Sequence, residues 1–289
     1  MMTDNQEEQA EAPLLAFQVI TDTHVTSDPE HAHNRNFERA LKDMIANQTG
    51  SCGIMHAGDV TDHGFPEEYE ELRRIWNDHK DDLPELYFTT GNHDVGLGVW
   101  QDRLSRFLSA TDMTAPYHDH WIHGYHFIFL GTEKGLELFC DLSEDQLKWL
   151  DAKLGEEASP ERPAFVFLHQ PLKDTVAGSF EAQNWFGVTQ DSELKAVLSK
   201  HRHAILFTGH THWELDAAHN FRDGDGRLPA MFNAASVGYL WTDGDEHKDG
   251  SQGYYVEVYE DRVLVRGRDF AQGAWVEAAQ FQVNYSVRG

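Results

Sequence analysis

Short apolar segments that each end in a polar turn constrain the fold of this sequence more than any other feature. The apolar runs are LLAFQVI, CGIMHA, ELYFTT, AFVFL and AILFT, and the turns that follow them are TDTH, GDVTD, GNHD, HQP and GHTH. Runs of this length before turn residues are typical of buried β-strands. Because ligands in open α/β sheets collect at the carboxyl ends of the strands, we expect these turns to form one site.

Segments with a helical pattern lie between the strands. Pro66 stands at an early helical turn, and Ser143 with Gln146 resembles a capping box. We expect helices over residues 34–47, 66–78, 143–154 and 191–200. The spacing of successive turns suits strand–helix–strand units of about 30 residues or more, which predicts parallel strands. Short alternating strands over residues 253–258 and 262–269 predict a mixed sheet towards the C-terminus.

These elements predict an α/β fold in one large domain. A chain of 289 residues, of which 40% are hydrophobic, can bury a sizeable core. It has no internal repeat and no long Gly, Ser or Pro linker that would divide it. We expect a disordered acidic tail over residues 1–13 and a single domain over residues 14–289.

The strong negative charge of the chain limits its partners. With 23 Lys and Arg against 49 Asp and Glu, the net charge is −26, which disfavours duplex nucleic acid and anionic membranes. Binding of an anionic substrate then requires positive charge at the site. Metal ions can provide that charge, and the 18 His can supply neutral ligands for them. A homo-oligomer is compatible with the sequence.

Two further features bear on the compartment of the protein. Cys52 and Cys140 are too few for a disulfide framework, so we expect them as reduced thiols. The first residues lack the pattern of a secretory signal, and no run reaches the roughly 18–20 apolar residues of a membrane span. We therefore expect a cytoplasmic protein.

The polar turns hold residues with the chemistry and spacing of metal ligands. Asp22 and His24 are two residues apart, so both side chains leave the same face of an extended chain, and His210 with His212 repeats this spacing. Asp59 has two carboxylate oxygens and is suited to bridging two cations. The candidate ligands for two ions are Asp22, His24, Asp59, Asn92, His169, His210 and His212.

The GNHD turn combines three kinds of polar group. Asn92 offers an amide oxygen to a metal or a substrate, His93 offers an imidazole, and Asp94 offers a carboxylate that we expect to orient that imidazole. We therefore interpret His93 and Asp94 as catalytic residues. Asp62, in GDVTD, is better explained as a brace for the loop or for a ligand.

The set TDTH, GDVTD, GNHD, LHQP and GHTH, which spans residues 22–212, resembles the calcineurin-like metallophosphoesterases. The resemblance implies an αββα sandwich of two mixed sheets. It also implies that Asp59 bridges two metals that the other ligands hold in two groups, namely Asp22, His24 and His212, and Asn92, His169 and His210.

The motifs also separate branches of that family. In the purple acid phosphatase branch a Tyr stands near the position of Asp62 and the third motif is GNHE, so no tyrosinate ligand is expected here. The pattern looks more like the small bacterial phosphodiesterases, a branch that includes cyclic-nucleotide hydrolases.

We expect the metals to lower the pKa of a shared water from about 15.7 towards about 7, so that hydroxide attacks phosphorus at neutral pH. His93, held near Asp94, is expected to protonate the departing alkoxide. His, Asp and Asn ligands suit Mn, Fe, Zn or Co and argue against an all-oxygen Mg or Ca site.

Loops above the strand ends are expected to choose the substrate. Trp185, in the long connection over residues 171–190, is a candidate for stacking on a base or aryl group, and residues 239–241 form another candidate rim. The His-rich segment over residues 117–126 is better explained as a hairpin that turns at His123-Gly124 than as a further metal site.

Several functions remain open at this point. The leading hypothesis is hydrolysis of a small phosphodiester, and the motifs do not separate it from hydrolysis of a phosphomonoester. A catalytically inactive metal-binding scaffold is the alternative from a different class, although it would be expected to have lost His93 or some ligands. A DNA nuclease is disfavoured because duplex binding needs a basic stripe.

Overall fold

The computed structural model describes residues 11–47 and 50–285. Most of the predicted acidic tail, residues 1–10, lies outside the described part. Among the described residues, no helix combines the length and the apolar character needed to cross a bilayer. Cys52 and Cys140 are both free thiols, as predicted, and burial raises the pKa of the Cys140 thiol.

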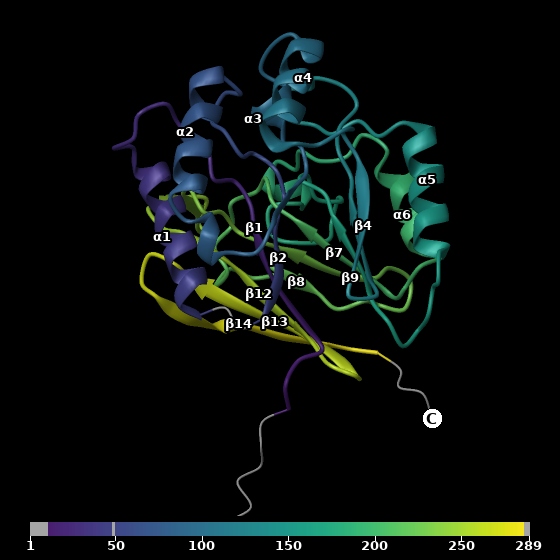
Figure 1. Cartoon of the computed structure of the whole chain (residues 1–289). Helices are drawn as coiled ribbons and strands as arrows, with labels where there is room; N and C mark the ends of the chain where they lie inside the picture. The colour runs from purple at the N-terminus through teal and green to yellow at the C-terminus, as the bar shows by residue number, and fades with distance from the viewer. Residues whose placement is uncertain (1–10, 48–49, 286–289) are drawn as a thin grey trace, which may run out of the picture.

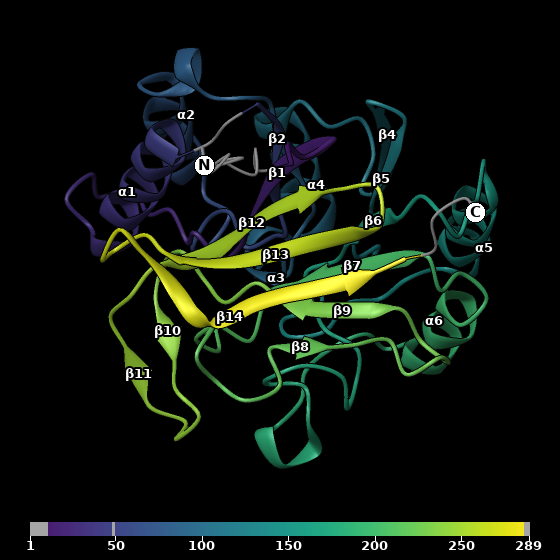
Figure 2. The ribbon, with the colours of Figure 1, turned by 90° about the horizontal axis from the view of Figure 1, so that it is seen from below.

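The first six-stranded sheet carries the first three predicted strand ends. Its order is β14 (Ala274–Asn284), β13 (Arg262–Asp269), β12 (Gln252–Val258), β1 (Leu15–Ile20), β2 (Ser51–His56) and β3 (Leu86–Phe88). The strands β1, β2 and β3 run parallel, whereas β12, β13 and β14 form an antiparallel meander whose long strands lie side by side in Figure 2. The sheet is therefore mixed, as the alternating C-terminal segments predict.

The second six-stranded sheet carries the remaining strand ends. Its order is β4 (His118–Ile122), β5 (Tyr125–Phe129), β6 (Ala164–Phe167), β7 (Ala204–Thr208), β9 (Ala230–Asn233) and β8 (Phe221–Arg222). The antiparallel pair β4 and β5 turns at His123-Gly124, which confirms the predicted hairpin. A small pair, β10 (Leu240–Trp241) and β11 (His247–Lys248), lies apart from both sheets (Figure 2).

Helices cover the outer faces of the two sheets, as Figure 1 shows. The first sheet packs against α1 (Ala32–Asn47), α2 (Pro66–Asn77) and α4 (Trp100–Thr111). The second packs against α5 (Glu144–Gly155) and α6 (Asp191–Leu198). Three single-turn elements complete the described helices: η1 (Lys80–Asp82), α3 (Asn92–Val95) and η2 (Glu181–Gln183). The fold is therefore the αββα sandwich that the resemblance implied.

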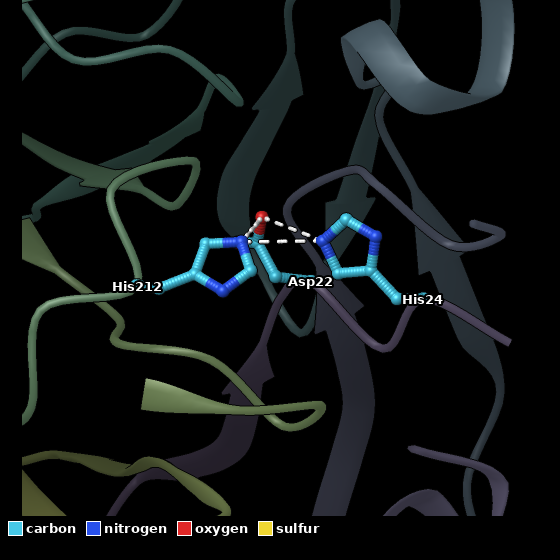
Figure 3. A group of neighbouring side chains, drawn as sticks. All are labelled: Asp22, His24 and His212. Atoms are coloured by element: carbon cyan, nitrogen blue, oxygen red, sulfur yellow. Dashed lines mark hydrogen bonds and ion pairs between the residues drawn. The ribbon is translucent and has the colours of Figure 1, made fainter. Parts of the chain in front are cut away.

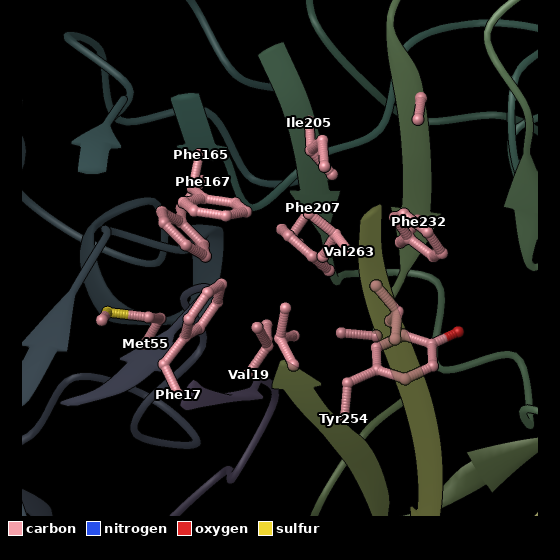
Figure 4. Close-up of a cluster of buried hydrophobic side chains, with 14 of the residues drawn as sticks. Phe17, Val19, Met55, Phe165, Phe167, Ile205, Phe207, Phe232, Tyr254 and Val263 are labelled. Atoms are coloured by element: carbon pink, nitrogen blue, oxygen red, sulfur yellow. The ribbon is translucent and has the colours of Figure 1, made fainter. Parts of the chain in front are cut away.

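An aromatic core fills the space between the sheets (Figure 4). The Phe17 ring of the first sheet lies 4.8 Å, centre to centre, from the Phe165 ring of the second, and both residues are fully buried. Ile20 of β1 and Val166 of β6 point instead into the outer clusters beneath the helices. Burial on both faces explains why these strands are continuous apolar runs rather than alternating ones.

The start of α5 shows how a predicted cap is used. The Ser143 hydroxyl oxygen accepts a hydrogen bond from the Gln146 backbone N–H at 3.1 Å, as the capping-box pattern predicts. The Gln146 side chain does not return to Ser143 but pairs with both backbone groups of Gly131. The cap thereby ties α5 to the loop that follows β5.

Candidate metal centre

The turns after β1, β2, β3, β6 and β7 meet at one edge of the sandwich. Their acidic and imidazole side chains form three overlapping groups in which the candidate ligand atoms all lie within 4.8 Å of one another. The groups are Asp22, His24 and His212, then His24, Asp59 and His93, and finally Asp59, His169 and His210. Six of the seven predicted ligands therefore converge on one buried site.

One half of the centre is formed by Asp22, His24 and His212 (Figure 3). His212 Nε2 lies 2.9 Å from Asp22 Oδ1, and His24 Nε2 lies 3.7 Å from the same oxygen. The two Nε2 atoms face each other at 3.2 Å. Three donor atoms from the ends of β1 and β7 thus point at a common position.

The other half is joined to the first through Asp59. Its Oδ2 atom lies 3.1 Å from His169 Nε2 and 3.8 Å from His24 Nε2. The His210 ring lies 5.1 Å from the His169 ring, centre to centre. One carboxylate oxygen thus faces imidazoles from both halves, which is the arrangement that a bridging ligand requires.

The backbone fixes one oxygen of each central carboxylate and leaves the other for a cation. Asp59 Oδ1 accepts the His93 N–H at 2.8 Å, and Asp22 Oδ2 accepts the His210 N–H at 2.9 Å. Asp22 Oδ1 and His169 Nε2 are buried but take part in no hydrogen bond of normal geometry. Because unpaired buried polar atoms are destabilising, these donors fit a divalent metal ion.

The outward nitrogens of the imidazoles are also held. His169 Nδ1 lies 2.8 Å from Ala57 O, and His212 Nδ1 lies 3.2 Å from Tyr239 O. When Nδ1 carries the proton, its N–H donates to these carbonyls. The Nε2 atom then faces the centre with a lone pair that can bind a metal. His24 Nδ1 makes no hydrogen bond of normal geometry but lies 3.3 Å from Asp62 Oδ1, so the Asp62 carboxylate contacts a candidate ligand.

The backbone at the site adopts an uncommon conformation. Five candidate ligands have positive φ angles, between 44° and 70°: Asp22, His24, Asp59, His210 and His212. Left-handed backbone is unfavourable outside glycine and clusters at functional sites. The neighbouring chain must also approach closely, since a Cβ atom on Gly91 would lie 2.0 Å from Asp59 Oδ1. The fold therefore accepts local strain to aim these side chains inwards.

His93 and Asp94 of the GNHD turn contact different groups. His93 Nδ1 lies 2.6 Å from Asp62 O, and the His93 ring lies 4.6 Å from the His24 ring. The Asp94 carboxylate accepts N–H groups of Val60, Thr61 and Gly91, together with the Thr61 hydroxyl. Burial and the nearby Asp59 raise the pKa of Asp94 to about 6. The expected pairing of Asp94 with the His93 ring is thus replaced by a contact to Asp62.

Asn92 opens α3 and is buried beside the centre. Its amide oxygen accepts a hydrogen bond from Gln170 Nε2 at 3.2 Å, and its amide nitrogen donates to Glu137 O at 2.9 Å. This pairing fixes which end of the amide is the oxygen. The predicted roles of Asn92 as a metal ligand and substrate contact stay predictions, as do the individual roles of the other candidate ligands.

Comparison with known families identifies the origin of this arrangement. The model of the calcineurin-like phosphoesterases matches residues 16–214, which include every motif described above. The chain belongs to this family. It is therefore a metallophosphoesterase, and its clustered Asp and His side chains are consistent with a two-metal site.

Curated relatives of this metallophosphoesterase carry more specific names. A Synechococcus protein named a probable cyclic nucleotide phosphodiesterase is 27% identical over 70% of this chain and 75% of its own length. A Nostoc protein named a 3′,5′-cyclic-nucleotide phosphodiesterase is 25% identical over 56% of each chain. These are distant relatives.

A solved structure supports the fold. The purple acid phosphatase PPD1 of yellow lupin superposes with a TM-score of 0.68 at 12% identity, over 93% of this chain. The phosphoesterase spans only 53% of that plant enzyme, so the likeness concerns the sandwich alone.

Electrostatics predict that metal loading of the phosphoesterase releases protons. Burial lowers the pKa of His24, but Asp22 and Asp62 outweigh it and raise that pKa to about 10. Burial also lowers the pKa of His169, but Asp59 and Asp22 outweigh this effect and raise that pKa to about 9. Without metal, both rings therefore carry protons at pH 7, and a cation must displace them.

We expect the apparent metal affinity to rise with pH up to about pH 10, because His169 and then His24 lose their protons over this range. Isothermal titration of Mn²⁺ or Zn²⁺ into the metal-free protein, in buffers of different ionisation enthalpy, measures the protons released. Between pH 6 and 8 we expect about one to two protons for each pair of ions bound. A pH-independent affinity with no proton release would contradict this assignment.

A cavity of about 220 Å³ adjoins the metal centre at His210. Its lining includes three aromatic side chains, Phe186, Trp213 and Trp241. Trp185 does not line it, because its indole N–H donates to Pro171 O and its ring packs near Phe139. Trp241 belongs to the predicted rim, whereas Trp213 carried no sequence signal beyond following GHTH. A substrate contact by Trp185 stays a prediction.

Proposed function

We propose that this metallophosphoesterase hydrolyses small phosphodiesters, with 3′,5′-cyclic nucleotides as the substrate class. The observation that carries the proposal is the pair of ligand groups joined by Asp59, with the His93 ring at their open side. The names of the Synechococcus and Nostoc relatives support a diester over a monoester.

The residues suited to hold the metals fall into two groups. Asp22, His24 and His212 would hold one ion, His169 and His210 would hold the other, and Asp59 would be shared. The family resemblance adds Asn92 to the second group. When bound, the metals lower the pKa of water to supply the nucleophile and offset charge on the phosphate oxygens. The chain contributes ligands whose orientation the backbone fixes before substrate arrives.

His93 is suited to deliver the proton that the leaving alkoxide needs. Its side chain is 31% exposed, whereas most of the candidate ligands are buried, so a substrate can reach it. In the protonated ring, Nδ1–H donates to Asp62 O, and Nε2–H remains available for the leaving oxygen. The Asp62 carbonyl therefore positions the acid, while the Asp62 carboxylate braces His24.

The charge of the site favours a diester over a monoester. Among the described residues, those that line the adjoining cavity include Asp245 but no Lys or Arg. A phosphomonoester carries an additional negative charge that such side chains commonly pair. Without them, the metals alone must balance the substrate, which suits the singly charged diester better.

Rates on matched substrates test the proposal. With Mn²⁺-loaded protein, we expect kcat/KM on bis-p-nitrophenyl phosphate to exceed that on p-nitrophenyl phosphate by more than about 10-fold, or about 1.4 kcal/mol in the barrier. Hydrolysis of 3′,5′-cyclic AMP is expected as well. Faster hydrolysis of the monoester would make the chain a phosphomonoesterase, and no hydrolysis of any of the three would favour the inactive scaffold.

A further inference from the structure

Tyr239 is held beside the first ligand group by the loop between β9 and β10. In this loop the Gly238 N–H donates to Asp22 O at 2.9 Å, and the Ser236 hydroxyl donates to the same carbonyl at 3.0 Å. The carbonyl oxygen of Tyr239 lies 3.2 Å from His212 Nδ1. The backbone around Tyr239 is therefore tied to both turns that supply the first group of ligands.

Imidazole rings surround the side chain of Tyr239. The rings of His33 and His247 stack against the Tyr239 ring, with centre-to-centre distances of 5.4 and 5.2 Å. The His212 ring lies 4.3 Å from the Tyr239 ring, and the His24 ring lies 5.6 Å from it. The phenol ring thus lies in a fixed orientation beside two candidate ligands of one metal ion.

The Tyr239 hydroxyl has no protein partner and is accessible. Among the described residues, no group forms a hydrogen bond with it. Tyr69 and Tyr254 also carry unpaired hydroxyls, but the protein encloses both of them. Tyr239 is only half-buried, and its hydroxyl is not enclosed. This O–H group is therefore free to donate a hydrogen bond to a ligand at the metal centre.

Electrostatic effects indicate that the hydroxyl of Tyr239 lies near the ligand groups. Burial raises the pKa of the phenol, and the carboxylates of Asp22, Asp59 and Asp62 raise it further. Because the interaction between two charges weakens with distance, an effect from all three carboxylates places the hydroxyl close to them. Two of the three, Asp22 and Asp59, are candidate ligands.

The chemistry of a phosphate ester matches this donor. Its non-bridging oxygens carry the negative charge, and hydrogen bonds to charged acceptors are stronger than those to neutral ones. The rings of Tyr239 and His93 both lie close to the His24 ring, at 5.6 and 4.6 Å. Since His93 is suited to serve the leaving oxygen, a non-bridging oxygen remains as the acceptor for Tyr239.

We propose that Tyr239 is a catalytic residue whose hydroxyl donates a hydrogen bond to a non-bridging oxygen of the substrate phosphate. The bond orients the phosphate at the metal centre and stabilises the charge that builds on its oxygens in the transition state. The proposal rests on the proposed function only in that a phosphate ester binds at this centre, and it holds for diesters and monoesters alike.

Removal of the hydroxyl tests the contact. Tyr239→Phe keeps the stacked ring and deletes only the O–H group. With Mn²⁺-loaded protein, we expect kcat/KM on methyl p-nitrophenyl phosphate to fall about 10-fold to 100-fold, as for loss of a hydrogen bond to a charged group. Metal content and melting temperature should stay at wild-type values. Tyr87→Phe is the matched control, because it removes a hydroxyl that pairs with Glu85, and it should keep the wild-type rate.

Sulfur substitution shows whether the lost bond reaches the phosphate. The Rp and Sp isomers of methyl p-nitrophenyl phosphorothioate each carry sulfur in place of one non-bridging oxygen, and sulfur is the weaker acceptor. The isomer whose sulfur faces Tyr239 already lacks most of the bond, so Tyr239→Phe should slow it less than the other isomer. We expect the ratio of the two rates to change about 5-fold or more. Both rates come from one preparation, so the ratio does not depend on the fraction of folded protein.

The possible failures are distinguishable. Wild-type rates in Tyr239→Phe, or equal slowing of both isomers, would overturn the contact and leave the diesterase function intact. Loss of metal in Tyr239→Phe would also overturn it, because the phenol would then support the ligands rather than the substrate. If the wild type hydrolyses only p-nitrophenyl phosphate, the diester function fails, and Tyr239→Phe should still slow that reaction about 10-fold or more. A wild type that hydrolyses none of these compounds would overturn both proposals.

Discussion

Replacement of Asp59 by Asn is expected to abolish hydrolysis, with a loss of more than about 1,000-fold in kcat/KM, because even groups that only support metal ligands contribute about 10-fold to 100-fold. Asn can still accept the His93 N–H through its remaining oxygen. Its amide N–H₂, however, would face His24 and His169 where the native chain presents Asp59 Oδ2. The variant thus places N–H groups where a cation needs the lone pair of an oxygen.

The measurement combines metal analysis with rates on bis-p-nitrophenyl phosphate. We expect Asp59→Asn to bind fewer ions than the wild type and to remain inactive at saturating Mn²⁺. Asp62→Asn is the matched control, since it removes a carboxylate 3.3 Å from His24 Nδ1 without removing a predicted ligand. Its expected cost is about 10-fold to 100-fold. Wild-type metal content together with wild-type rates in Asp59→Asn would refute the two-metal assignment.

The strands were predictable because burial on both faces gives continuous apolar runs. Four of the five helices longer than one turn in the described chain were also predicted within a few residues, but α4 was not. Apolar residues do recur at helical spacing in α4, at Trp100, Leu104, Phe107 and Leu108, so this helix could have been predicted from its sequence. An apolar run does not reveal which sheet a strand joins, because strands of both sheets are buried in the same way.

The types of residue at the site could be predicted from the sequence more readily than the orientation of their side chains. Residue types and their positions after strands identified six candidate ligands that the structure brings together. The local backbone could not be read from the sequence, because Asp and His at positive φ depend on contacts made by distant segments. The Asp94 expectation failed for a helical reason: His93 and Asp94 are consecutive residues of α3, and consecutive helical side chains do not face each other.

Replacement of His93 by Ala is expected to lower kcat by about 10²–10⁴-fold on 3′,5′-cyclic AMP, the range typical for loss of a general acid. Metal content should stay near that of the wild type, since His93 lies at the exposed side of the centre and its backbone N–H, which holds Asp59, is retained. Rates and metal analysis on the same preparations measure both effects.

The leaving group distinguishes proton donation by His93 from a purely structural role. An alkoxide is a poor leaving group that needs a proton, whereas nitrophenolate departs with little help, so an acid contributes less to its release. His93→Ala should therefore retain much more activity on bis-p-nitrophenyl phosphate than on cyclic AMP. His63→Ala, which removes an exposed imidazole that contacts the Asp62 carboxylate, is the control and should lower both rates equally, if at all. Equal losses on the two substrates in His93→Ala would assign His93 to support of the metal centre, because a damaged centre slows both reactions alike.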